Sequence, residues 1–239
     1  MPNRVESGKE VPLDNYLTDD LFGFLDVAPR DLLKVRRWGN YSGLPDIARE
    51  TTLEHTLSAV YLTAVMLAIE ESDPAGQHQG KLNHARLLLA AALHDIGEGV
   101  VGDVAFAVKQ DPRVKQGLKE IERESSEEKF RCLPHEARVV FRDAYQVEVE
   151  DSLHGRFFNA VERVGYMANA IPRFKAGHNQ YMETFENHLE PLRTLARDFV
   201  SVQVLLGAYF DWVGIQIDRA RRAREARALA DRVAGKTST

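Results

Sequence analysis

Cysteine is almost absent from this sequence. The chain has one, Cys132, among 239 residues, and a single thiol cannot form a disulfide within the chain. The first residues, MPNRVESGKEVPLDNYL, also lack the apolar core of a secretory signal peptide. Together these two features predict a cytoplasmic protein.

An excess of positive charge is also missing. The formal net charge is -5, whereas proteins that coat nucleic acid usually carry a basic stripe or a basic total. The C-terminal arginines in IDRARRAREARALADR are interleaved with acidic residues, which favours a solvated helix over an RNA-binding tail. We therefore expect a small-molecule ligand and no nucleic-acid partner.

Long hydrophobic runs are scarce as well. The most apolar stretches, 57–69 and 87–93, are too short or too interrupted by polar residues to span a bilayer. A hydrophobic fraction of 44% with 28% charged residues is ordinary for a folded globular protein. The sequence predicts one domain over residues 1–239 and no membrane segment.

No stretch offers convincing two-residue alternation, and helical periodicity dominates instead. Thr51 and Glu54 fit a capping box, and the apolar residues that follow recur at helical spacing. That helix is apolar on nearly all sides, so we expect it inside the protein, with His55 at its buried start. A second helix, over 85–96, is rich in Ala and Leu and ends before two glycines.

Further helices are expected over 114–132, 134–147, 153–171 and 189–217, the last continuing into the arginine-rich tail. Residues 39–46 and 71–81, which contain Gly and Pro, are expected to be loops. The sequence therefore predicts an all-α helical bundle, with a core over about 30–175 and a helical extension over about 186–235.

The string ALHDIGEGVVGD, residues 92–103, contains the residues that indicate chemistry. His94 and Asp95 are adjacent at a helix end, and Glu98 follows one helical turn later. Imidazole and carboxylate groups are the usual ligands of first-row metals, and His55 on another buried helix is the natural third ligand. A lone buried histidine is more often a core residue, but a buried Asp beside a buried His needs a compensating partner, which favours metal binding.

Residues 97–102, GEGVVG, also spell the dinucleotide-binding pattern G-x-G-x-x-G. That pattern requires a strand before it and a helix directly after it. Here a helix-forming Ala/Leu segment precedes it and a loop follows, so we expect no nucleotide cofactor.

The segments TLEHT (52–56) and HDIGEGVVGD (94–103) resemble the HD-domain metal-dependent phosphohydrolases. The resemblance is strongest to the branch of bacterial 5'-deoxynucleotidases and HD-domain-containing protein 2, since Arg37 and Trp38 match the Arg-Trp pair that precedes the first histidine. It covers residues 36–171. It implies an all-α HD domain that hydrolyses nucleoside 5'-monophosphates, with deoxyribonucleotides preferred, to nucleoside and phosphate, and that forms a homodimer.

The resemblance also implies a ligand set for a divalent ion, which could be Mn, Co, Fe, Zn or Mg. His55, His94 and Asp95 would be ligands, and the family's fourth ligand is an aspartate on a later helix, where this chain has Glu162. Helical spacing places Glu162 opposite an apolar stripe, which also fits a surface carboxylate. Whether Glu162 is a ligand therefore stays open.

For catalysis, the resemblance implies that Glu98 orients the attacking water and Asp103 protonates the leaving 5'-oxygen. Arg37 would bind the phosphate and Trp38 would lie against the sugar, with Lys109 as a second phosphate contact. Taken alone, the same residues also fit a polar helix end, a turn aspartate and a solvated arginine beside a half-buried indole. The prolines of the family's loop are replaced by AFA at 105–107, so base and sugar preference stay open.

Two alternative functions remain at this point. A deoxynucleoside triphosphate triphosphohydrolase would use the same metal chemistry but needs several more cationic groups than Arg37 and Lys109 provide. A non-catalytic HD fold would bind a metal or nucleotide only. The presence of both Glu98 and Asp103 favours a catalytic protein.

Overall fold

The computed structural model describes residues 19–38, 49–74, 77–102, 104, 108 and 111–233. Within these ranges the regular structure is helical, apart from one isolated antiparallel bridge between Arg36 and Thr51. The α-helices are α1 (Asp19–Lys34), α2 (Thr52–Ser72), α3 (His84–Leu93), α4 (Glu98–Val101), α6 (Pro112–Arg131), α7 (His135–Tyr145), α8 (Leu153–Lys175), α9 (Met182–Asp198) and α10 (Val200–Val233). The described residues also form the 3-10 helices η3 (Gln146–Val149) and η4 (Asn179–Tyr181). The predicted all-α fold is confirmed.

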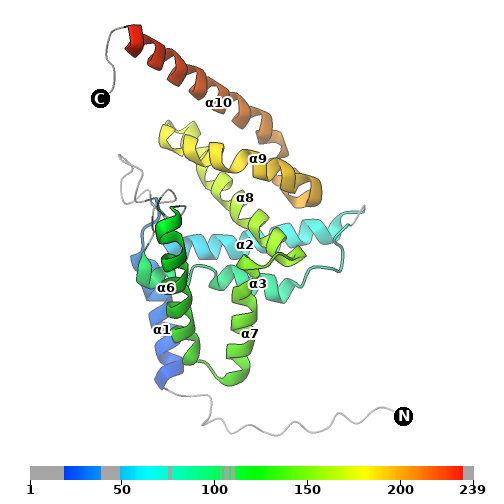
Figure 1. The fold of residues 1–239 in the computed structure, drawn as a ribbon. Helices are drawn as coiled ribbons and strands as arrows, with labels where there is room; N and C mark the ends of the chain where they lie inside the picture. The colour runs from blue at the N-terminus through cyan, green and yellow to red at the C-terminus, as the bar shows by residue number, and fades with distance from the viewer. Residues whose placement is uncertain are drawn as a thin grey trace.

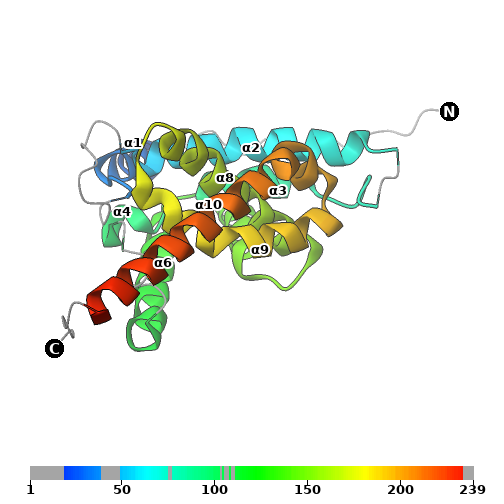
Figure 2. The same cartoon turned by 90° about the horizontal axis from the view of Figure 1, so that it is seen from above.

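Helix α2 is the centre of the arrangement. In Figure 1 it lies across the middle, with α1, α6 and α7 on one side and α8, α9 and α10 on the other. It packs against α1, α3, α8 and α10. Figure 2 shows α10 crossing α9, with the C-terminal end of α10 projecting beyond the other helices. The C-terminal region is therefore helical, but Phe185 of α9 and Val202 of α10 belong to the hydrophobic core, so the division into a core and an extension stays a prediction.

Two hydrophobic clusters form the core, and α3 contributes to both. Leu87 at the start of α3 belongs to the larger cluster, with Phe157 of α8 and Phe185 of α9. Leu93 at the end of α3 belongs to the smaller cluster, with Phe130 of α6. The end of α3 is therefore fixed on both sides, which holds the residues that follow it.

The start of α2 is fixed by the predicted capping box. The Thr51 side chain accepts a hydrogen bond from the Glu54 amide, and the Glu54 carboxylate accepts one from the Thr51 amide. These bonds satisfy amide groups that the first helical turn leaves unpaired. The helix therefore begins at a defined residue, which places His55 in its first turn.

The prediction that this helix is buried on all sides is wrong for one face. Leu57, Tyr61 and Val65 are 52%, 66% and 47% exposed, while His55, Ala59 and Met66 on the opposite face are buried. The neighbouring helices leave the face with Leu57, Tyr61 and Val65 uncovered, and hydropathy alone does not distinguish such a face from a buried one.

The prediction that the apolar segments are too short or too interrupted to span a bilayer also needs correction. Helix α2 runs for 21 residues, and both α2 and the Val200–Arg232 part of α10 are long and apolar enough to cross a bilayer by length and composition. In the structure α2 packs among four other helices, which is how a core helix of similar composition behaves.

The predicted helix over 189–217 is two helices. Phe199 separates α9 from α10 with an extended backbone (φ -119°, ψ 113°) and is fully buried. The Glu70 carboxylate of α2 accepts hydrogen bonds from the Ser201 amide (2.9 Å) and hydroxyl (2.6 Å), and so satisfies donors at the start of α10. The turn depends on these long-range contacts, which periodicity does not show.

Candidate metal centre

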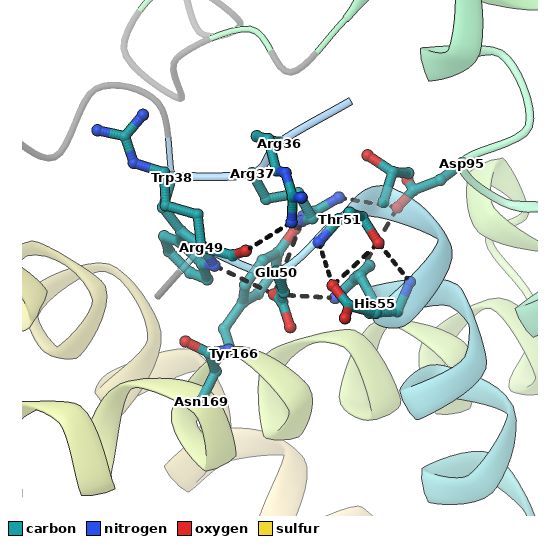
Figure 3. A network of polar contacts seen from close by, with 12 residues as sticks. Arg36, Arg37, Trp38, Arg49, Glu50, Thr51, His55, Asp95, Tyr166 and Asn169 are labelled. Atoms are coloured by element: carbon teal, nitrogen blue, oxygen red, sulfur yellow. Dashed lines mark hydrogen bonds and ion pairs between the residues drawn. The ribbon is translucent and has the colours of Figure 1, made fainter. Parts of the chain in front are cut away.

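The antiparallel bridge before α2 brings two sequence segments to one place. The Arg37 amide donates to the Glu50 carbonyl (2.9 Å), and the Thr52 amide donates to the Val35 carbonyl (3.0 Å). The segment that carries Arg37 and Trp38 therefore lies beside the first turn of α2. This pairing places the Arg-Trp element next to His55, as Figure 3 shows.

His55, His94 and Asp95 form one compact cluster. Their candidate ligand atoms all lie within 4.8 Å of one another. Asp95 Oδ2 lies 3.2 Å from His94 Nε2 and 3.7 Å from His55 Nε2. Both histidines are buried. The structure thus brings together the three residues that the sequence analysis placed at the core of a metal site.

The hydrogen bonding of His94 fits a metal ligand. Its Nδ1 lies 2.9 Å from the Ala91 carbonyl oxygen, which can only accept, so Nδ1 carries a proton and Nε2 is the nitrogen left for a metal. Without an ion the Asp95 carboxylate favours a second proton on Nε2, which a bound metal would displace. The Nε2 atom is buried and receives no hydrogen bond. A buried acceptor without a donor, facing a second imidazole and a carboxylate, is the donor set that a first-row divalent ion binds.

Arg37 neutralises the carboxylates of this site. Its Nη1 donates to Asp95 Oδ2 (2.8 Å) and Glu98 Oε2 (3.2 Å), and its Nη2 donates to the Tyr166 hydroxyl (3.3 Å). The Arg37 side chain is 8% exposed. Because buried carboxylates are costly without a counter-charge, this guanidinium stabilises the cluster. Its expected contact with a phosphate is not tested by these bonds.

The charges of the cluster shift the pKa values of its members in opposite directions. Burial alone would lower the pKa of His94, but the adjacent Asp95 carboxylate raises it to about 10. Burial would raise the pKa of Asp95, but His94 and Arg37 hold it well below its usual range. Burial and the positive charge of Arg37 lower the pKa of His55. The site therefore holds Asp95 as a carboxylate.

Glu98 lies at the same cluster. It is 4% exposed, and its Oε2 accepts from Arg37 and from the Thr52 hydroxyl at 3.4 Å. The turn that carries it follows helix α3 rather than a strand, so the G-x-G-x-x-G string lacks the context of a dinucleotide site, as predicted. The geometry places Glu98 beside the candidate ligands, in a position to contact a water molecule there.

Glu162 on α8 is partly buried, which does not fit a solvated surface carboxylate. Burial, followed by the charge of Glu148, raises the pKa of Glu162 to about 7, while His94 acts in the opposite direction. Glu162 therefore interacts electrostatically with the cluster, although it is not one of the three residues within 4.8 Å. Its role as a fourth ligand stays a prediction.

Three residues of the site were not anticipated from the sequence. Glu50 contacts His55 and Trp38, and Tyr166 stacks near His55 with ring centroids 6.0 Å apart. Burial raises the pKa of the Glu148 carboxyl on η3, which interacts with His94 and Asp95. Tyr166 follows Glu162 by four residues on one helix face, a spacing that could have identified it.

Of the three remaining predicted residues, the structure describes Trp38 but not Asp103 or Lys109. Trp38 is half-buried and packs against Tyr166 and Tyr181, with ring centroids 6.1 and 5.3 Å apart. Asp103 and Lys109 lie outside the described residues, so their predicted roles in proton donation and phosphate binding stay predictions.

The fold and the cluster define a class of protein. A helical bundle with one histidine on α2 and an adjacent His-Asp pair after α3 is the arrangement of an HD domain. The family model described as 5'-deoxynucleotidase YfbR-like matches residues 24–211. The chain therefore belongs to the YfbR-like 5'-deoxynucleotidase family, a family of hydrolases.

Curated relatives are similar over part of the chain. A 5'-deoxynucleotidase of Pasteurella multocida is 29% identical over 108 residues, which cover 45% of this chain and 52% of that protein. A 5'-deoxynucleotidase of Yersinia pestis (strain Pestoides F) is 22% identical over 143 residues, 58% of this chain and 68% of that protein. The chain thus spans about half the length of the Pasteurella relative.

Solved structures show the same fold. An HD-domain phosphohydrolase from Listeria innocua matches with a TM-score of 0.63 and 18% identity, over 80% of this chain and 90% of that one. A protein from Magnetospirillum magnetotacticum, described as a metal-dependent phosphohydrolase, matches with a TM-score of 0.54 and 20% identity, over 87% and 96%. These likenesses confirm the HD-domain fold.

Proposed function

We propose that this protein is a divalent-metal-dependent 5'-nucleotidase that hydrolyses nucleoside 5'-monophosphates, with deoxyribonucleotides preferred, to nucleoside and phosphate. The observation that carries the proposal is the buried cluster of His55, His94 and Asp95 with the Arg37 guanidinium 2.8 Å from Asp95. Membership of the YfbR-like family and the similarity to two bacterial 5'-deoxynucleotidases support it.

His55, His94 and Asp95 would hold the metal. A bound divalent ion would lower the pKa of a water molecule toward neutrality and polarise the phosphoryl group. Glu162 would be the fourth ligand, since it interacts with the charges of all three residues. His/Asp sites accept several first-row ions, so Mn, Co, Fe and Zn, and also Mg, are the ions to test.

The other residues would bind and orient the reacting groups. Glu98, buried beside Asp95, would accept a proton from the attacking water and hold it in line with the phosphorus. Asp103 would donate a proton to the 5'-oxygen as the P–O bond breaks. Arg37 would also donate to a phosphate oxygen, because its guanidinium has five N–H groups and can bind several acceptors at once. Lys109 is the second proposed phosphate contact.

The experiment is elemental analysis of the purified protein, followed by assays with dAMP, AMP and dATP in the presence of manganese, cobalt or zinc. Release of inorganic phosphate and deoxyadenosine from dAMP supports the proposal. Release of tripolyphosphate from dATP, with dAMP left intact, would identify a triphosphohydrolase instead. A protein that binds metal but hydrolyses none of the three would be a non-catalytic member of the fold.

Two finer expectations accompany this proposal. We propose that the protein acts in the cytoplasm and as a homodimer, both of which stay predictions. Light scattering coupled to size-exclusion chromatography measures the oligomeric state directly, and a mass of about one chain would contradict the dimer.

A further inference from the structure

Glu50 lies where the Arg-Trp segment meets the first turn of α2. Its carbonyl accepts the Arg37 amide, and its side chain, 14% exposed, extends toward His55. Figure 3 shows Glu50 between Trp38, Arg37 and His55. The proposed function assigns Glu50 no role, and the sequence analysis did not select it.

One oxygen of Glu50 contacts three groups of the site. Oε1 accepts the indole N–H of Trp38 at 3.1 Å. The same atom lies 3.6 Å from His55 Nδ1 and 4.0 Å from Arg37 Nε. This carboxylate therefore connects the Arg-Trp pair to a candidate metal ligand.

The first consequence concerns the orientation of His55. Its Nδ1 faces Glu50 and its Nε2 faces Asp95. A carboxylate beside Nδ1 favours the tautomer with the proton on that nitrogen, which leaves the Nε2 lone pair for a metal. His94 reaches the same tautomer through the Ala91 carbonyl, so each imidazole has an acceptor on the side away from the cluster.

The second consequence concerns Trp38. Its backbone has φ +66°, and among the described residues other than glycine it alone has a positive φ. A bulky residue is strained in this region and stays there only when its surroundings hold it. The hydrogen bond to Glu50 and the packing against Tyr181 hold the indole in place.

We propose that Glu50 is a positioning residue that sets the orientation of His55 toward the metal and of Trp38 toward the nucleotide. The metal half of this proposal rests on the chain's own cluster, and the nucleotide half rests on the proposed function. An acceptor on a ligand histidine typically changes metal affinity by 10- to 100-fold.

The test compares Glu50→Gln and Glu50→Leu with Glu54→Gln. Gln keeps an acceptor of the same shape without the charge, and Leu removes both. Glu54 is the matched control, because it lies four residues further along and bonds to Thr51 in the capping box. Cobalt affinity is measured by titration calorimetry, and stability by thermal unfolding of the metal-free proteins.

We expect Glu50→Gln to weaken cobalt binding by about 10-fold and Glu50→Leu by up to about 100-fold. Glu54→Gln should change cobalt affinity by less than about 2-fold, because a glutamine oxygen can still accept the Thr51 amide in the capping box and the start of α2 is kept. Parental affinity in both Glu50 variants would overturn the proposal. If Glu50→Leu does not fold, the isosteric Glu50→Gln decides alone.

The Trp38 half has its own measurement. In a Trp212→Phe background, Trp38 is the single tryptophan. Acrylamide quenching of its emission should increase in Glu50→Leu, because the hydrogen bond from the indole N–H to Glu50 is lost. Unchanged quenching would remove Trp38 from the proposal. A parent that binds cobalt but hydrolyses no nucleotide would refute the proposed function and the nucleotide half of this proposal, and would leave the metal half standing. A parent that binds no cobalt would overturn the metal half and the proposed function together.

Discussion

His188 on α9 should make the stability of the protein depend on pH. It is 9% exposed, its Nδ1 accepts a hydrogen bond from Arg163 Nη1 at 3.1 Å, and its ring stacks on Tyr166 with centroids 4.8 Å apart. Burial and the positive charge of Arg163 lower its pKa from 6.5 to about 4. The folded protein therefore holds a neutral imidazole at this position.

The sign of the effect follows from proton uptake. Between pH 6.5 and about 4 the unfolded chain binds a proton at His188 that the folded chain does not, so stability increases with pH across this window. The contribution is fully present above pH 6.5 and is lost as pH falls toward 4. With 1.36 kcal/mol per pKa unit, the loss amounts to about 2 kcal/mol at pH 5 and about 3 kcal/mol at its limit.

The variant His188→Asn tests this, because an amide oxygen can still accept from Arg163 but does not titrate. Urea unfolding in the presence of EDTA gives the free energy of unfolding of parent and variant at pH 7.5 and 5. We expect the difference between them to change by about 2 kcal/mol in favour of the variant at the lower pH. His135→Gln, which removes an exposed imidazole at the start of α7, is the control and should keep the parental dependence. Parallel pH curves for parent and His188→Asn would refute the reasoning.

Three further predictions concern the residues of the site and the glycine that precedes Glu98. Asp95→Asn should abolish both metal binding and hydrolysis. Glu98→Gln should keep the metal, as measured by elemental analysis, but lose about 10²-fold or more in kcat. Loss of metal in Glu98→Gln would make Glu98 a ligand. Glu162→Gln should weaken metal affinity by at least about 10-fold in a calorimetric titration if Glu162 is the fourth ligand, and parental affinity would exclude that role. Gly97→Ala should destabilise the fold by about 1–3 kcal/mol in urea unfolding, because its Cβ would lie 2.7 Å from a backbone carbonyl of α6. The control Gly117→Ala, whose Cβ would have nothing within 4 Å, should stabilise the fold by about 0.5–1 kcal/mol. Equal effects of the two substitutions would contradict the argument.

The site could be predicted from the sequence where its geometry is local. His94, Asp95 and Glu98 lie within five residues, so the turn after α3 determines their arrangement. The capping box likewise defined the start of α2 and thus the position of His55. Arg37 could be predicted only through the family resemblance, since a bridge to a distant segment brings it to the cluster.

The parts that the sequence did not show depend on contacts between distant segments. Helix α1 was not predicted, although Ala28 and Leu32 give it a buried side. The turn at Phe199 depends on Glu70 of α2, which is more than a hundred residues away. The role proposed for Glu50 also depends on a contact outside its own segment, with Trp38. Periodicity reports which residues are apolar, but not which surface covers them.

The guanidinium of Arg37 has a consequence for how the protein could exchange its metal. Asp95 and Glu98 both accept hydrogen bonds from it, so departure of an ion does not leave two carboxylates facing each other without a cation. Because a neighbouring cation lowers the cost of burying the two carboxylates, the centre is stabilised electrostatically even when no ion is bound. The identity of the bound metal would then follow the supply of ions in the cell rather than an ion trapped during folding.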